Sequence, residues 1–191
     1  MVAALIMARA TSHDLLTGRR GFDRAALWLD RATIVFSVLG TLGILGIMAL
    51  VVSDVIARGA LNRPLVGVPE IVSMSILAIV FLQLPNTVAR GQLTRSDMLV
   101  VRLAESAPRR GLWLDAICHL LGGVIVGTLV WALVPLFIRT WTRNEMVGTM
   151  GQFLAPLWPV HGIVLLGSIM LCAVFLMRAA ALAILAEEKR L

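Results

Sequence analysis

The chain has 191 residues, of which 59% are hydrophobic and 15% are charged, and its formal net charge is +6. Soluble domains carry about 25% charged residues, and a soluble domain of this size leaves roughly a third of its unfolded surface exposed. The composition therefore excludes an ordinary soluble globule and predicts an all-α integral membrane protein with one domain over residues 1–191. The cations fall in short blocks between apolar runs, so we expect no nucleic-acid partner.

Four uncharged stretches are long enough to cross a bilayer, which takes about 20 apolar residues. They cover residues 32–53, 71–89, 116–138 and 146–177. The last stretch is too long for one helix, and Pro156 and Pro159 interrupt its first half, so residues 146–157 are expected to form an extramembrane or re-entrant loop. We predict four transmembrane helices, at about residues 32–57, 70–90, 115–138 and 158–178.

The cations divide unequally between the two sides of this arrangement. Thirteen of the 17 Lys and Arg residues fall on the side of the termini and of the segment between the second and third spans. The other four are Arg58, Arg63, Arg139 and Arg143. The positive-inside rule then predicts that both termini are cytoplasmic and that both outer loops are short.

Two segments outside the spans have an amphipathic helical pattern. Residues 21–31 either form a short helix along the cytoplasmic interface or extend the first span. Residues 96–106 form a second interfacial helix, which Ser96 can cap and Pro108 ends. Near the predicted span ends lie the tryptophans of an aromatic belt, Trp28, Trp113, Trp141 and Trp158, while Trp131 lies deeper in the third span.

Charged residues surround the loop between the first two spans. Asp54 and Arg58 are four residues apart on one helix face and can form an ion pair. Pro69 suits the start of the second span, and Glu70 beside it lies at the positive end of that helix, where it can also pair with Arg58 or Arg63. The first interpretation of these charges is a salt-bridged helix end; the alternative is a direct role in a solute path.

The predicted spans carry no Asp, Glu, Lys or Arg near their middle, where such residues are usually functional. His119 and His161 fall near opposite faces of the bilayer, so they cannot share a haem and are expected to be packing or interfacial histidines. Cys118 and Cys172 have no CxxC context. We therefore expect no catalytic or substrate-binding residue, no metal and no cofactor, and no enzyme activity.

The spans do carry residues that favour close helix packing. These are Gly40, Gly43 and Gly46 in the first span, and Gly123 and Gly127 in the third. In the second span Gln83 and Asn86 can hydrogen-bond across helices. Pro85 and Pro135 are expected to kink the second and third spans.

Several short motifs follow one another in an order that resembles a known family. They are Asp54-Val-Ile-Ala-Arg58, Asn62-Arg63-Pro64-Leu65, Gly67-Val-Pro-Glu70, Arg90-Gly91 with Asp97-Met98-Leu99, and Ala155-Pro156-Leu157-Trp158-Pro159. With four spans and both termini inside, this order is similar to the small membrane subunit (DctQ-type) of tripartite ATP-independent periplasmic (TRAP) transporters. Leu93 and Ser96 stand where that family usually has a histidine and a valine.

The resemblance implies a function that the composition does not. Such a subunit belongs to a secondary transporter of the bacterial inner membrane, driven by an ion gradient, with Na⁺ as the expected ion. Its partners are a large multi-span permease subunit, a periplasmic binding protein that delivers an organic acid, and membrane lipids. The small subunit is a scaffold for the large subunit, which moves as an elevator.

The same resemblance selects candidate residues for structural roles or for the subunit interface. They are Asp54, Arg58, Asn62, Arg63, Pro64, Glu70, Gln83, Asn86, Arg90, Gly91, Asp97 and Trp158. Two alternative functions remain open from the sequence: a membrane-anchor subunit of a redox complex, and a small transporter that works alone.

Overall fold

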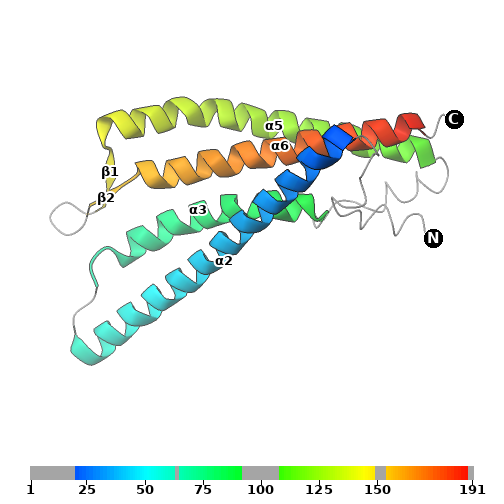
Figure 1. Cartoon of the computed structure of the whole chain (residues 1–191). Helices are drawn as coiled ribbons and strands as arrows, with labels where there is room; N and C mark the ends of the chain where they lie inside the picture. The colour runs from blue at the N-terminus through cyan, green and yellow to red at the C-terminus, as the bar shows by residue number, and fades with distance from the viewer. Residues whose placement is uncertain (1–19, 63–64, 92–107, 149–153, 189–191) are drawn as a thin grey trace.

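A computed structural model of the chain describes residues 20–62, 65–91, 108–148 and 154–188. The described part contains four long helices, and the colours of Figure 1 follow them from blue near the N-terminus to red near the C-terminus. They are α2 (Arg20–Leu61), α3 (Val68–Ala89), α5 (Pro108–Arg143) and α6 (Trp158–Glu188). Each is long and apolar enough to cross a membrane, so the prediction of four such helices is confirmed.

The first helix is longer than its apolar run. α2 has 42 residues, which is about 63 Å at ~1.5 Å per residue, or twice the hydrocarbon thickness of a bilayer. Residues 21–31 are part of α2, so they extend the first span, which was one of the two expected arrangements. They do not form a separate short helix. The other expected interfacial helix, at residues 96–106, lies outside the described residues.

Left-handed residues mark four of the helix ends, and one of them is Asn144, which follows α5 with φ of 46°. Asn62 follows α2 with φ of 51°, a conformation that asparagine adopts more readily than most residues. Gly67 precedes α3 with φ of 85°, its carbonyl accepts the N–H of Ile71, and Pro69 lies in the first turn as expected. Gly91 follows α3 with φ of 66° and donates its N–H to the carbonyl of Val88.

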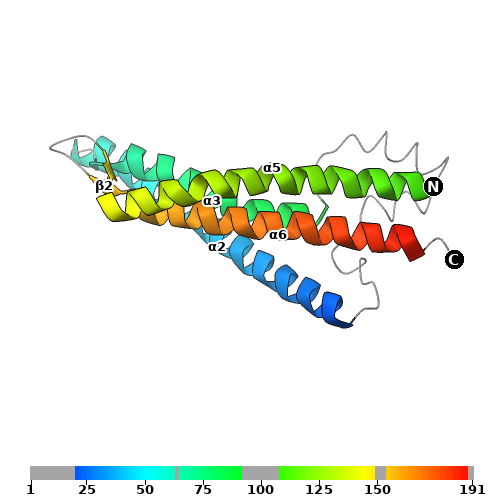
Figure 2. The same ribbon diagram turned by 90° about the horizontal axis from the view of Figure 1, so that it is seen from above.

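The helices form a row in which α3 and α6 are central, α2 packs on α3, and α5 packs on α6 (Figures 1 and 2). We call the end at which α2 and α5 begin and α3 and α6 finish the basic end, and the opposite end the hairpin end. A buried core lies near the basic end, between α3 and α6. Its members are Val88, Ala89, Leu171 and Val174, with Leu29, Leu84, Val126 and Phe175 packed against them.

The hairpin end takes its name from two short strands between α5 and α6. β1 (Met146–Val147) pairs antiparallel with β2 (Ala155–Pro156), with Met146 opposite Pro156. Leu157 extends the pairing by donating its N–H to the carbonyl of Glu145. The two ends of the loop expected at residues 146–157 therefore pair with each other as short antiparallel strands. The sequence did not predict this pairing.

Glycines allow the close contacts between neighbouring helices. A Cβ on Gly40 would lie 2.7 Å from the Cγ of Gln83, and one on Gly43 would lie 2.9 Å from the Cγ1 of Ile79, so both glycines serve the contact of α2 with α3. A Cβ on Gly46 would have no neighbour within 4 Å in the described part of the chain, so a packing role of this third glycine is not seen there and stays a prediction for contact with a partner. The pair predicted in α5 does face α6: Gly123 lies against Leu176 and Phe175, and Gly127 against Cys172.

Candidate functional site

Asp54 is a buried carboxylate at the hairpin end of α2, and it makes two hydrogen bonds. Oδ2 accepts from a terminal nitrogen of Arg58 at 2.9 Å, which confirms the predicted pair. Oδ1 accepts from the backbone N–H of Leu65 at 2.9 Å, across the loop to α3. The Arg58 side chain is 64% exposed and that of Asp54 10%, so water screens the ion pair and the backbone bond is the stronger contact.

The other candidates of this loop are less fully described. Asn62 ends α2 in the left-handed conformation, whereas Arg63 and Pro64 lie outside the described residues. Glu70 lies in the first turn of α3, where the helix dipole favours a negative charge. The pairing of Glu70 with Arg58 or Arg63 stays a prediction.

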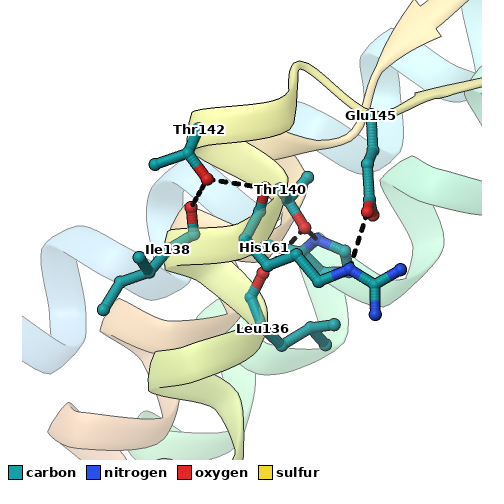
Figure 3. Close-up of polar contacts among 7 residues, drawn as sticks. Leu136, Ile138, Thr140, Thr142, Glu145 and His161 are labelled. Atoms are coloured by element: carbon teal, nitrogen blue, oxygen red, sulfur yellow. Dashed lines mark hydrogen bonds and ion pairs between the residues drawn. The ribbon is translucent and has the colours of Figure 1, made fainter.

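A second polar cluster joins α5 to α6 at the hairpin end (Figure 3). The buried Thr140 hydroxyl donates to the carbonyl of Leu136 at 2.8 Å and lies 3.1 Å from Nδ1 of His161. Because that hydroxyl has one proton, Nδ1 of His161 is the donor in the second contact. Arg139 Nε donates to Oε1 of Glu145 at 2.8 Å, which ties the end of α5 to the start of the hairpin. These bonds hold the turn between the two helices in place.

Tryptophan rings pack beside this cluster. Trp158, the first residue of α6, meets Trp141 of α5 edge to face, with ring centroids 4.8 Å apart. Phe137 contacts Trp141 in turn at 6.0 Å. Trp158 is therefore a packing residue at the hairpin end, in agreement with its expected place near a span end.

At the basic end, a buried arginine links α6 to α3. Arg178 donates from a terminal nitrogen to the carbonyl of Ala89 at 2.7 Å. This carbonyl belongs to the last turn of α3, where carbonyls lack partners within the helix and the dipole favours a cation. Sequence reasoning counted Arg178 only as a cation that ends an apolar run; its position opposite a helix C-terminus could not be seen from the sequence.

Of the two polar residues of α3 that were predicted to hydrogen-bond across helices, Asn86 instead bonds within its own helix. Asn86 Oδ1 accepts from Nε of Arg90 at 3.1 Å, one turn along the same helix, so the bond that the structure gives it does not cross to another helix. Gln83 does reach across, because its side chain lies against Gly40 of α2. Gly91 ends the helix, and Asp97 lies outside the described residues.

His119 is buried near the start of α5. Its Nδ1 lies 2.8 Å from the carbonyl of Asp115 and 3.3 Å from Oδ1 of the same residue, and its ring contacts Phe175. His161 lies at the other end of the α5–α6 pair, so the structure agrees with the expectation of two separate packing histidines. Within the described ranges, no group of three or more His, Cys, Asp and Glu side chains could hold a metal ion.

The candidate residues that the structure describes thus form two groups at opposite ends of the row of helices, not one site. A chain whose described part consists mainly of four helices able to span a bilayer, with polar contacts at the helix ends, is a multi-pass membrane protein. The family model described as "Tripartite ATP-independent periplasmic transporters, DctQ component" matches residues 47–185, and the chain belongs to this family. It is a family of transporter components and not of enzymes. No curated protein and no solved structure gave a match.

Proposed function

We propose that the chain is the small permease subunit of a TRAP transporter that imports an organic acid with an ion gradient, using Na⁺ as the coupling ion. Membership of the DctQ family carries this proposal. In it the chain packs against a large permease subunit of the bacterial inner membrane, and a periplasmic binding protein delivers the solute. The basic end faces the cytoplasm, because most of the cations lie on that side.

The outer helices of the row support a scaffold role. In the most apolar 18-residue segment of α2, only 6% of the residues are buried by the rest of the chain, and the same holds for α5. A helix that keeps its apolar surface free can contact lipid on one side and a second membrane protein on another. The proposed scaffold uses this surface to enlarge the fixed part of the large subunit.

Trp131 favours the outer face of α5 as the contact with the large subunit. Its side chain is 81% exposed, and it lies four residues, or about 6 Å, from the middle of the apolar run at 116–138. Hydrocarbon offers no acceptor to an indole N–H, which is why tryptophan prefers the membrane interfaces. A neighbouring protein helix can supply the acceptor and cover the ring.

Uptake by reconstituted subunits tests the proposed function. The organic acid is chosen as the one that raises the melting temperature of the purified binding protein encoded with this chain. Liposomes that hold the large subunit and this chain should accumulate the radiolabelled acid when binding protein and an inward Na⁺ gradient are present. Liposomes without this chain should not. Equal uptake without the chain would contradict the proposal, and equal uptake with K⁺ in place of Na⁺ would contradict the ion assignment.

A further inference from the structure

The first turns of α2 present two arginines and a tryptophan on one face. Arg24, Trp28 and Arg31 follow one another at spacings of four and three residues, so they lie in line along the helix. All three side chains are exposed, and that of Trp28 is 73% exposed. Asp23 and Asp30 lie to one side of this line and are half-buried.

The opposite face of the same turns contacts the rest of the molecule. Leu29 packs against the buried core of α3 and α6, and the Thr33 hydroxyl is fully buried and donates to the carbonyl of Asp30 at 2.8 Å. Figure 2 shows the start of α2 angled away from the other helices. The arginine and tryptophan side chains therefore point away from the described part of the chain.

The apolar run that follows sets the depth of this face in the membrane. Residues 32–53 form 22 consecutive uncharged positions of α2, which span about 33 Å, close to the ~30 Å of a hydrocarbon core. Arg31 then lies at the hydrocarbon boundary, with Trp28 and Arg24 about 5 and 10 Å further along the axis. A bilayer adds roughly 5 to 7 Å of headgroup layer on each side, so Arg31 and Trp28 lie within that layer, and the long side chain of Arg24 can reach back to it from just outside.

The chemistry of the face complements an anionic headgroup. A guanidinium donates two parallel hydrogen bonds to a phosphate, and an indole ring suits the boundary between headgroup and acyl chain. The same line of α2 continues into the hydrocarbon region with the exposed side chains of Val35, Val38 and Leu42. Charge and apolar surface thus follow each other in the order in which a phospholipid presents its phosphate and its chains.

We propose that Arg24, Trp28 and Arg31 form a binding site for the phosphodiester headgroup of an anionic phospholipid, with an acyl chain along Val35, Val38 and Leu42. The site needs α2 to span a bilayer, but it does not depend on the transport function. It gives the chain a preference for an anionic leaflet at its basic end.

Native mass spectrometry of the full chain, delipidated in mild detergent, tests this site with phosphatidylglycerol and phosphatidylcholine as the two probes. The wild type should retain phosphatidylglycerol preferentially. Arg24→Gln combined with Arg31→Gln should lower the affinity for phosphatidylglycerol by roughly 30-fold, since each cation near an anionic surface contributes about fivefold. Arg58→Gln combined with Arg143→Gln removes the same charge from exposed positions at the hairpin end and should change little.

Three outcomes would overturn the site. The first is equal retention of the two lipids by the wild type. This outcome is measured on the wild-type chain alone, so it does not depend on whether a variant folds. The second is an equal loss in both double variants, which shows a general charge effect. The third is displacement of the lipid by inorganic phosphate at low millimolar concentration, which shows a site for a free anion. Arg24→Lys combined with Arg31→Lys keeps the charge and should retain part of the preference.

Discussion

Asp54 connects the end of α2 with the loop that leads to α3, through one bond to Arg58 and one to the backbone of Leu65. Asp54→Asn keeps an acceptor for the N–H of Leu65 and should lower the unfolding free energy by less than ~1 kcal/mol. Asp54→Ala removes both bonds and leaves that N–H without its acceptor, which should cost about 1–3 kcal/mol. Thermal unfolding of the purified chain in detergent measures both. Equal losses in the two variants would show that the charge, not the backbone bond, stabilises the loop.

Trp131 distinguishes a protein-covered face from a lipid-covered one. Trp131→Phe keeps most of the ring and removes the N–H, so the proposed contact predicts less large subunit recovered with a tagged chain. Trp131→Ala should reduce recovery further. Trp28→Phe, at the similarly exposed tryptophan of α2, is the matched control and should not change recovery. Wild-type recovery for both Trp131 variants would place the interface elsewhere.

Contacts at the scale of single residues were only partly predictable. The Asp54–Arg58 pair follows from spacing on one helix, so the sequence was sufficient for it. The bond from Arg178 to Ala89 joins residues that are 89 positions apart, and no periodicity reports which helix ends meet. Asn86 was expected to bond across helices, yet Arg90 lies one turn away and competes for the same oxygen.

At the scale of the helix, Gly167 governs the closest approach of α6 to α3. A Cβ at this position would collide with the backbone carbonyl oxygen of Phe81, which cannot rotate away as a side chain can. Gly167→Ala should therefore destabilise the purified chain by about 1–3 kcal/mol. Gly46→Ala, on an open face of α2, should be neutral or should stabilise the helix by up to ~1 kcal/mol. Similar melting temperatures for the two variants would contradict this role of Gly167.

The helices themselves were predictable to different degrees. Apolar run length fixed their number, because hydrocarbon thickness sets the length of a span. It did not fix their ends: α2 begins at Arg20, well before the run at 32–53, because a charged residue ends an apolar run without ending a helix. Glycine spacing likewise identified a packing face in α2, although it included Gly46, which has no neighbour in the described part of the chain. It missed Gly167 of α6, which no spacing pattern marked.

The described part of the molecule is a row of four helices, and the most apolar segments of the outer two remain almost unburied. The order of the helices in this row depends on contacts between distant segments, which one sequence does not report. The family membership was predictable from the order of short motifs, and the motif residues that the structure describes lie at loops and helix ends, where turn geometry restricts the residues. The proposed scaffold role would connect two observations: the open apolar surface of the outer helices and the membership of a family of transporter components.

Co-expression with the large permease subunit tests directly whether this chain is a stable scaffold for that subunit. A tagged chain, extracted in mild detergent, should elute from a size-exclusion column as one peak with the large subunit, identified by mass spectrometry. We expect a stable complex that contains the two chains in equal amounts. Elution of the two proteins in separate peaks, with each one folded, would contradict it.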